Sequence, residues 1–485
     1  MATMPPPVAK TLSEANEIIA RLHAENEALR AENAALRARV AELEARLAEL
    51  EARVGQNSTN SSRPPSSDAP WSKPKRKPPE ESSGRKPGGQ PGHPPHVREP
   101  VPPEQVARTR DVFPDKCGIC GLELPPDVAA LDAYEHQVTD LPEIRPEVTG
   151  VRLWRKRCPR CRGFTRARLP ADVPKGAFGP RLKATVTALT AKYGLSRREL
   201  IEAIKDLFGM ELSVGAVQAI CEEVSEAVAP AVAQVKAEVE KSAAVNADET
   251  GWRQKGEMHW LWTAATPDAA FFVLAPDRGH AALDTLFSRT LEGVLMSDRW
   301  VAYERFEVEK RQLCHAHLRR DFQAAIDRGG QAKPVGQRLL DESNRMFKLW
   351  HAFTRAEMDR SALAAAMEPV KAAWEDAVLA AIESSDRKLA ALGADLWNHW
   401  DALWTFVAAD GVEPTNNEAE RTLRPAVTWR KCCFGTQSDR GSQFVARMMT
   451  VVQTARRRGV NPLDWLERAC RASLIGLAPP PIFST

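Results

Sequence analysis

Two aspartates follow apolar runs that are typical of buried strands. Asp248 follows AVNA, and Asp298 directly follows GVLMS. A strand that only fills a core has no use for a charge at its end, whereas a metal site often places a carboxylate on a rigid element. One such aspartate is more often a turn or cap residue, but two predict a matched pair on neighbouring strand ends. Glu249, on the other side of the pleat, is expected to pair with a base or to cap a turn.

A third carboxylate is expected from a helix in PTNNEAERTLRP, because two divalent ions about 4 Å apart usually need at least three such ligands. Thr415 or Asn416 would cap this helix. Glu418 and Glu420 are two residues apart and point about 200° away from each other, so only one can face the site. Spacing alone does not choose between them, and an ion pair with Arg424 is the alternative use of Glu420.

Two C-x-x-C pairs, Cys117 with Cys120 and Cys158 with Cys161, predict a structural Zn²⁺ site. Four thiolates around one ion satisfy the tetrahedral preference of zinc. In a reducing compartment this use of cysteine is favoured over disulfides. A gap of 37 residues separates the pairs, and strands such as HQVTDLP and EVTGVRLWRKR are expected to fill it.

A basic stretch surrounds the second cysteine pair. It contains eight basic residues and no acidic ones between Arg152 and Arg168, which predicts a surface that follows a phosphate backbone. The residues predicted to contact DNA there are Arg155, Lys156, Arg157, Arg160 and Arg162. The basic residues of the preceding linker are Lys73, Lys75, Arg76, Lys77, Arg85 and Lys86. They could also lie along phosphates, although solubility explains them equally well.

The elements that would position these residues begin with a coiled coil over 11–54, where apolar residues recur every seven positions. One seam position is taken by Leu22, Leu29, Leu36, Leu43 and Leu50. The other is taken by Ile19, Asn26, Asn33, Val40, Leu47 and Val54. Buried asparagines can bond across two helices and favour a parallel dimer in one register. A single long helix packed elsewhere in the chain is the alternative.

Composition and periodicity divide the rest of the chain. Residues 55–100 form a Pro/Gly/Ser-rich basic linker, and 101–172 form the zinc-binding domain. Residues 173–242 are predicted to be helical, with a candidate helix-turn-helix whose helices begin at Ser196 and Ser213. A plain helical packing layer is the alternative. Strands are expected in EMHWLWTAAT, AAFFVLAP and GVLMSDRW, a helix in AALDTLFSRTL, and a helical segment and tail in 441–485.

The totals exclude some classes of protein. A length of 485 residues suggests roughly three units. The formal net charge of +3 is nearly neutral, so attraction to DNA must come from local patches. No apolar run approaches the roughly 18 residues of a membrane span, and MATMPPPVAK has no apolar signal region. A cytoplasmic protein without a membrane partner is expected.

In this order, the motifs resemble those of DDE-type bacterial transposases of the insertion-sequence 66 family. The resemblance runs nearly end to end. It rests on the leucine zipper, NSSRPPSSD, RKPGGQPGH, the paired C-x-x-C motifs, ADET, Asp298 with Tyr303 shortly after it, CHAHLRR, and NNEAERTLRP followed by RK and SDRG. The chain departs from the family pattern at His315, where an aromatic residue is common, and at Thr415, where Asp is common.

The resemblance implies a multidomain α+β protein. Its catalytic domain would be a ribonuclease H-like α/β domain over 243–440, with a helical insertion at about 325–410. It also implies that Asp248, Asp298 and Glu420 are the catalytic triad and the ligands of Mg²⁺, with Mn²⁺ as a substitute. Glu420 is selected because it occupies the glutamate of the family's A-E-R. Asp248 would bridge two ions, Asp298 would hold one and Glu420 the other.

The resemblance suggests roles for further residues near the triad. His317 matches a family histidine and would support the active site, although a satisfied histidine near a strand end is the alternative. Phosphate contacts are expected from Arg319, Arg320, Arg421, Arg424, Arg430 and Lys431.

The implied activity is hydrolysis at the element ends, followed by attack of the freed 3′-hydroxyl on target DNA. The implied partners are the terminal repeats, target DNA, a second or further copy of the chain through the coiled coil, and accessory proteins of the same element. A non-catalytic zinc and helix-turn-helix regulator is the alternative, and it predicts DNA binding that is indifferent to the carboxylates. A nuclease that cuts without joining shares the triad and differs only in its product.

Overall fold

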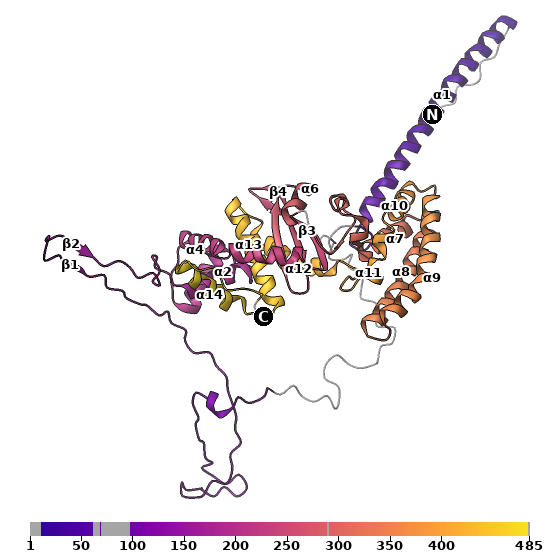
Figure 1. Ribbon diagram of the computed structural model, residues 1–485. Helices are drawn as coiled ribbons and strands as arrows, with labels where there is room; N and C mark the ends of the chain where they lie inside the picture. The colour runs from indigo at the N-terminus through magenta and orange to yellow at the C-terminus, as the bar shows by residue number, and fades with distance from the viewer. Residues whose placement is uncertain (1–10, 62–67, 69–97, 289–290, 484–485) are drawn as a thin grey trace. The chain divides into compact units, whose positions relative to one another are not determined.

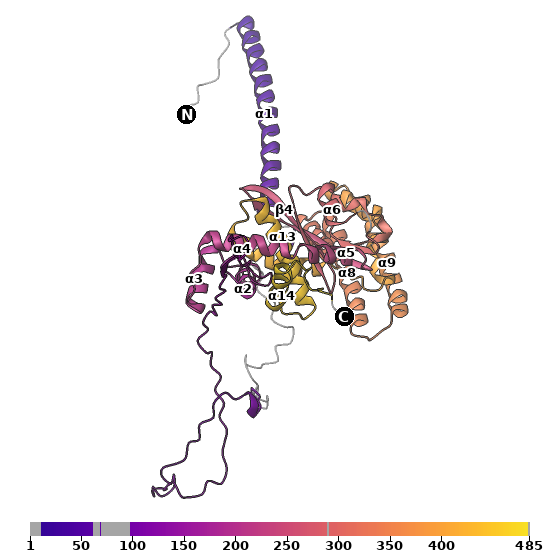
Figure 2. The same ribbon diagram turned by 60° about the vertical axis from the view of Figure 1, so that its left-hand side comes forward.

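A computed structural model of the chain describes residues 11–61, 68, 98–288 and 291–483 (Figure 1 and Figure 2). By their contacts, the described residues fall into two units. The larger lies within residues 1–73, 151–202 and 212–485, and the smaller within 74–150 and 203–211. No helix in the described ranges is long and apolar enough to cross a membrane. The predicted linker contacts from Lys73 to Lys86, like the motif RKPGGQPGH, lie outside the described residues.

The predicted N-terminal helix is present as α1, Leu12–Val54, a continuous helix of 43 residues. The apolar residues of both seams, from Ile19 to Val54, are exposed along it. An apolar seam that no other described part of the chain covers is the expected state of a coiled-coil helix without its partner. The helix is therefore confirmed, while its pairing stays a prediction.

The segment between the cysteine pairs differs from the expectation. Every residue from 121 to 154 is described, and none belongs to a strand. Val138 and Leu141 of HQVTDLP are exposed, so this segment has no buried strand face. Only the end of EVTGVRLWRKR forms a strand, β1 (Arg155–Arg157), which pairs antiparallel with β2 (Phe164–Arg166). A short 3₁₀ helix, η2, spans Pro103–Gln105.

The predicted helical segment contains α2 (Pro180–Ala191), α3 (Arg197–Phe208), α4 (Val214–Ala227) and α5 (Ala229–Glu240). Both predicted N-caps are confirmed. The Ser196 hydroxyl accepts the Glu199 N–H at 3.3 Å, and the Glu199 carboxylate accepts the Ser196 N–H at 2.9 Å. This reciprocal pair is a capping box. The Ser213 hydroxyl accepts the Ala216 N–H at 3.1 Å.

Charge and packing of α4 bear on the helix-turn-helix prediction. The helix contains no basic residue, and Glu223 and Glu226 are exposed on it. Its apolar face packs against α2, α13 (Asp439–Arg457) and α14 (Pro462–Leu474). An acidic outer face repels phosphates, so α4 is a poor recognition helix. These features favour the packing-layer alternative, and base reading by this segment stays a prediction.

A five-stranded sheet forms the centre of the larger unit, in the order β5-β4-β3-β6-β7. The first three strands pair antiparallel, and β6 and β7 continue parallel to β3. The strands expected in EMHWLWTAAT, AAFFVLAP and GVLMSDRW, and the strand that carries Asp248, are confirmed, whereas β7 was not expected. The bounds of the five strands are β3 Ala244–Gln254, β4 Glu257–Ala265, β5 Ala270–Ala275, β6 Val294–Ser297 and β7 Arg311–Leu313.

Helices cover both faces of the sheet. On one face α12 (Asn417–Cys433) crosses β3 and β4, with Trp429 edge-on to Trp252 of β3 at 6.5 Å between ring centroids. On the other face lie α6 (His280–Leu286) and the 3₁₀ helix η3 (Val301–Arg305), where Tyr303 meets Trp262 of β4 at 6.0 Å. Successive residues along each strand therefore point alternately to two different helical layers.

Helix α13 corrects the predicted boundary at 440. It packs along β5, where Thr450 and Thr454 accept the N–H groups of Phe272 and Ala270 at 3.0 and 3.1 Å. These hydroxyls satisfy an edge strand whose donors would otherwise lack partners. The segment predicted to be a C-terminal helical segment and tail thus supplies a helix that covers the edge of the sheet (Figure 1).

The helical insertion predicted at about 325–410 is present. It contains α8 (Ala332–Thr354), α9 (Arg360–Ile382), α10 (Arg387–Asn398) and α11 (Thr405–Ala408), together with the end of α7 (His315–Arg328). Two short 3₁₀ helices, η4 (Val308–Lys310) and η5 (Asp401–Leu403), flank β7 and α11. Buried residues such as Phe322, Met346, Trp374, Leu396 and Trp404 give it an apolar core.

The two ends of this insertion are hydrogen-bonded to each other. The His315 N–H donates to the Pro414 carbonyl at 2.9 Å. The Asn416 N–H donates to the Cys314 sulfur at 3.2 Å. About a hundred residues of chain therefore leave the sheet and return to it at one place.

Candidate active site

The two aspartates lie side by side at the sheet, although β3 does not end at Asp248 as expected. The strand continues to Gln254, paired beyond Asp248 with β4 alone. The parallel register pairs Asn246 with Met296, and extending it by two residues places Asp248 next to Asp298. Asp298 leaves the sheet directly after β6, and its Oδ1 accepts the Trp300 N–H at 2.9 Å.

The aspartate pair is electrostatically unsatisfied. Burial raises the pKa of Asp248 well above its usual range, and the neighbouring charges of Glu249 and Asp298 raise it further. His317 acts in the opposite direction. Carboxylates that repel each other in a partly desolvated place favour a proton or a cation between them.

Glu249 has the partners that sequence reasoning expected of it. Its buried carboxylate accepts hydrogen bonds from Arg278 Nε at 2.5 Å and from the Tyr303 hydroxyl at 2.8 Å. Burial and Asp298 raise the pKa of Glu249, while Arg278 and Tyr303 lower it. The prediction of a base partner is confirmed, and Glu249 is held on the face away from α12.

The two candidate glutamates of α12 have different surroundings. Glu420 Oε1 lies 3.8 Å from His317 Nε2 and 3.9 Å from Arg320 Nη2. Glu418 instead accepts Arg457 Nη2 of α13 at 2.5 Å. Because Glu418 is already bound to an arginine of the packing layer, Glu420 is the glutamate that faces the histidine.

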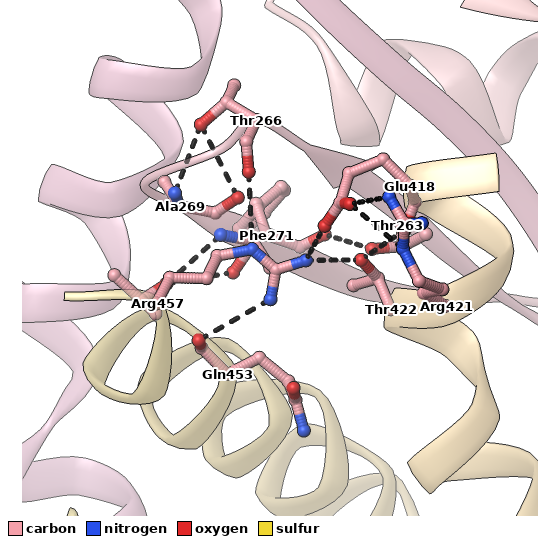
Figure 3. A network of polar contacts seen from close by, with 11 residues as sticks. Thr263, Thr266, Ala269, Phe271, Glu418, Arg421, Thr422, Gln453 and Arg457 are labelled. Carbon is pink, nitrogen blue, oxygen red and sulfur yellow. Dashed lines mark hydrogen bonds and ion pairs between the residues drawn. The ribbon is translucent and has the colours of Figure 1, made fainter. Parts of the chain in front are cut away.

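A polar network fixes the rotation of α12 about its axis (Figure 3). Arg457 donates to Glu418, to the buried hydroxyl of Thr422 and to the Thr266 carbonyl at the turn after β4. Burial lowers the pKa of Arg457, whereas Glu418 raises it. Three elements are joined through one guanidinium, so Glu418 and Glu420 cannot exchange faces without breaking the network.

Asn416 does not cap α12 in the way that was expected. It occupies the N-cap position, but its side chain makes no capping hydrogen bond. Its amide donates to the Ala247 carbonyl at 2.7 Å, and its Oδ1 is buried without a partner among the described residues. The prediction failed because the amide joins the start of α12 to β3, one residue before Asp248.

The two histidines of CHAHLRR face opposite environments. Burial alone would lower the pKa of His317, but Cys314 and Asp298 outweigh it and raise the pKa to about 9. His315 is fully buried beside Trp374 and Trp404, and its Nε2 bonds the Leu403 carbonyl at 2.9 Å. Burial lowers its pKa to about 4. His315 therefore occupies an aromatic core position.

The donor side chains of the candidate site bear on metal binding. Within the described ranges, no group of three or more His, Cys, Asp or Glu side chains lies close enough to hold one ion. Asp248 and Asp298 nevertheless supply the hard oxygen donors that Mg²⁺ prefers, and their mutual repulsion would be relieved by a divalent cation. In donor type and charge, the pair fits such a cation.

The cysteine pairs form two tight turns of the same kind. The Cys117 N–H bonds the Leu122 carbonyl at 2.8 Å, and the Cys158 N–H bonds the Gly163 carbonyl at 2.8 Å. The backbone N–H groups three and two residues on lower the pKa of each first cysteine thiol. Each turn is therefore suited to hold thiolates.

Several predicted phosphate contacts are already used within the fold. Arg430 donates to the Thr250 hydroxyl at 3.2 Å and to the Gly251 carbonyl, so it binds α12 to β3. Arg421 pairs with Glu418 at 2.6 Å. Arg319 is half-buried over the ring of Phe347. These contacts give the three arginines structural roles.

Other predicted contacts are free to meet DNA. Arg424 and Lys431 are exposed on α12. The basic residues of the β1–β2 hairpin are exposed as well, with Arg155 stacked over Phe164 at 4.4 Å. The exposed hairpin residues are Arg155, Lys156, Arg157, Arg160 and Arg162.

Sequence reasoning missed Gln254, which explains the motif SDRG. Its Nε2 donates to Asp439 Oδ1 at 2.6 Å, and its Oε1 accepts the Ser442 hydroxyl. The Ser438 hydroxyl accepts the Gly441 N–H at 3.1 Å and caps α13. The sequence did contain a signal for this role: Gln254 lies an even number of residues after Asp248 on the same strand, so both side chains point to the same face of the sheet.

Sequence reasoning also missed Arg278, which contacts Glu249 and lies 3.9 Å from Asp298 Oδ2. Its guanidinium stacks 4.9 Å from the ring of Trp260 and 3.9 Å from that of Trp300. It follows β5 in sequence and has no motif of its own, so only the folded chain brings it to the carboxylates.

Comparison with known proteins places this geometry in a family. The model described as "Transposase IS66 family" matches residues 175–444, a span that includes Asp248, Asp298 and Glu420. DUF6444, a family of unknown function, matches residues 4–99. The uncharacterized protein y4hP of Sinorhizobium fredii is 25% identical over 414 residues, which cover 76% of this chain and 73% of that protein. The uncharacterized protein y4qI of the same organism is 26% identical over 236 residues, 43% of this chain and 42% of that protein. Because the first match covers more than half of the chain, this protein belongs to the IS66 family of transposases.

Proposed function

We propose that Asp248, Asp298 and Glu420 form the catalytic site with which this transposase cleaves DNA at the ends of its element and joins it to target DNA. One observation carries the proposal. The parallel register of β3 and β6 runs towards Asp248 and Asp298, whose charges interact, and His317, whose charge acts on Asp248, lies 3.8 Å from Glu420. Three antiparallel strands followed by two parallel ones support the ribonuclease H-like assignment.

Asp248 and Asp298 would hold one divalent cation, Mg²⁺ or Mn²⁺, and Glu420 would be a ligand of a second. When bound, such a cation stabilises negative charge on the phosphate oxygens during displacement. Each carboxylate sits on a rigid element: Asp248 on β3, Asp298 at the end of β6 and Glu420 in the first turn of α12. Rigid support limits the reorganisation needed before reaction.

The surrounding residues would orient the DNA. His317 and Arg320 carry their nitrogens within 4 Å of Glu420, where they can donate to oxygens of the scissile phosphate. Arg278 and Tyr303 hold Glu249 on the opposite face, so that this carboxylate does not compete for the site. Water, and then the freed 3′-hydroxyl, would attack phosphorus in line with the leaving oxygen.

The dimer is proposed to form through α1, because its charges complement a parallel partner. The g positions beside the seam carry glutamate in the first half of the paired region and arginine in the second half, and the e positions carry the reverse. In a parallel, in-register pair, each residue at the g position faces the e residue five places on in the partner. The four pairs are Glu25 with Arg30, Glu32 with Arg37, Arg39 with Glu44 and Arg46 with Glu51. Every pair is of opposite charge.

Structural zinc is proposed for the cysteine turns. Their backbone N–H groups stabilise thiolates, and a thiolate is the form that binds zinc. Elemental analysis of the purified chain should find zinc, and Cys158→Ser should lower the content. An unchanged zinc content in Cys158→Ser would remove Cys158 from the ligands.

The function is tested by cleavage and strand transfer on labelled DNA that carries the element's own end, with Mg²⁺ and the accessory proteins supplied. Asp298→Asn and Glu420→Gln should each lose at least about 100-fold in rate while DNA binding persists, since a charged ligand is removed. Glu418→Gln is the matched control on the same helix. It should keep the chemistry and lower thermal stability.

Two results would contradict the proposal. If Glu420→Gln cuts as well as the wild type while Glu418→Gln does not, the third carboxylate is misassigned. If the wild type binds the element end but neither cuts nor joins it, the protein acts as a regulator. Cutting without joining would identify a nuclease.

A further inference from the structure

Phe434 is an apolar residue in an unfavourable conformation. It follows α12 directly, its backbone is left-handed with φ 58°, and its side chain is 81% exposed. A left-handed backbone is unfavourable for a residue other than glycine, and a glycine or asparagine at this cap would avoid the strain. The exposed ring itself serves neither the cap, which needs only the backbone N–H, nor the core, which points to a use in binding.

The backbone around Phe434 is firmly held. The Phe434 N–H donates to the Arg430 carbonyl at 2.8 Å. Thr436 donates to the Arg253 carbonyl and accepts the Lys255 N–H, both at 2.8 Å, so the chain after Phe434 is bonded to the tip of the β3–β4 hairpin. Exposure of the ring is thus a fixed feature of the fold.

Phe434 also continues a line of residues that begins at the active site. Successive helical residues turn by about 100°, so Arg424 and Lys431 fall within about 40° of Glu420 around the axis of α12, and Phe434 follows the last helical residue, Cys433. Arg424, Lys431 and Phe434 are exposed. From Glu420 to Phe434 the helix rises about 21 Å, which corresponds to about six base steps of B-form DNA.

The charge around the ring is mainly basic. Lys431 precedes it on α12, and Arg253 and Lys255 are exposed on the hairpin to which its backbone is bonded. Glu257 is the acidic residue on that turn. Cations that follow a backbone, interleaved with an exposed aromatic ring, are the arrangement used to bind unpaired nucleic acid, because every base has a face that can stack.

We propose that Phe434 stacks on an unpaired base of the DNA, while Arg424 and Lys431 bind the phosphates between that base and the scissile bond. The proposal rests on the proposed function, since it takes DNA as the substrate. It adds a second contact point at the far end of α12, which would favour strands that are already open at about six steps from the cut.

Binding can be measured without catalysis. The fluorescence anisotropy of a labelled oligothymidine of about 30 nucleotides, and of the same strand paired in a duplex, would be followed without Mg²⁺. Phe434→Ala should weaken single-strand binding about tenfold and duplex binding less than about twofold, and Phe434→Trp should restore the difference. Lys431→Ala should weaken both probes, because phosphates are present in both.

Tyr193→Ala removes another exposed aromatic, on the loop after α2, and should leave both affinities unchanged. Equal effects of Phe434→Ala on both probes, or no effect on either, would overturn the stacking proposal. A change in the sedimentation of DNA-free Phe434→Ala would show that a second copy of the chain covers the ring. Inactive DNA cleavage together with an intact single-strand preference would leave this inference standing while the proposed chemistry fails.

Discussion

At the residue scale, two histidines of one motif differ in charge because only one of them lies near carboxylates. His317 stands near three carboxylates and retains its proton, with a pKa of about 9. His315 lies among aromatic rings and is neutral, with a pKa of about 4. Two residues of α7, about half a turn, therefore separate a cationic group at the candidate site from an uncharged one in the core.

His315 should make stability depend on acid. Its pKa rises from about 4 in the folded chain to an ordinary value of about 6.5 on unfolding. Its contribution is thus fully present above about pH 6.5 and is lost as the pH falls towards 4, by about 3 kcal/mol. His315→Phe should be slightly less stable at pH 7, because the Leu403 carbonyl loses its donor, yet lose less stability at pH 4.5. Urea unfolding at both pH values checks this, and parallel losses in the two proteins would show that His315 does not titrate.

The carboxylates proposed for catalysis could be picked out from sequence, while most of their supports could not. Asp248 and Asp298 were visible because an apolar run precedes each, and such a run marks a buried strand before its partners are known. Spacing did not choose between Glu418 and Glu420, and the family resemblance selected Glu420; the contact that occupies Glu418 comes from a distant residue, Arg457. Arg278 was invisible for the same reason, since its partners come from other strands.

At the element scale, the β3–β4 hairpin and α12 act as one clamp. Both run well past the carboxylates. Thr436, which follows α12, joins their far ends, while Gln254 bonds the hairpin to α13. The expectation that β3 stops at Asp248 was wrong because antiparallel pairing with β4 continues after β6 has ended. An apolar pattern marks where a strand is buried, but only its partners decide where it ends.

Gly435 should be required for this clamp. A side chain there would place its Cβ 2.1 Å from the Arg253 carbonyl, whereas at Gly256 the space is open. Both glycines have positive φ, 109° and 83°. Gly256→Ala should cost about 1 kcal/mol from backbone strain alone, and Gly435→Ala at least about 3 kcal/mol. Thermal unfolding compares them directly. Equal losses would mean that the close approach to Arg253 is unimportant.

At the scale of the whole molecule, two copies of the active site are expected to be joined through α1. Of the strands predicted between the cysteine pairs only the end of the second formed, and the linker contacts lie outside the described residues, so long-range organisation was the least predictable part of the chain. The coiled-coil helix α1 is an exception, because its apolar seam and the charges beside it lie in one continuous segment of sequence.

Charge exchange should test the orientation of that dimer. Glu25→Arg with Glu32→Arg should weaken self-association by about 2 kcal/mol or more, because four attractive pairs become repulsive. Arg30→Glu with Arg37→Glu should do the same, and mixing the two variants should restore a heterodimer. Sedimentation equilibrium measures each case. Glu17→Arg with Glu27→Arg changes charge outside the seam and should have little effect. Failure of the mixture to associate would exclude the parallel register.

The hydrogen bonds from His315 to Pro414 and from Asn416 to Cys314 close the base of the helical insertion. The chain enters and leaves the helical insertion at a single place. The size of the insertion therefore has no effect on the geometry of β3 and β6. The insertion could lengthen, shorten or acquire new surfaces over evolution without displacing Glu420. A foreign domain could be grafted at this same place, and the transposase would then carry that domain to DNA.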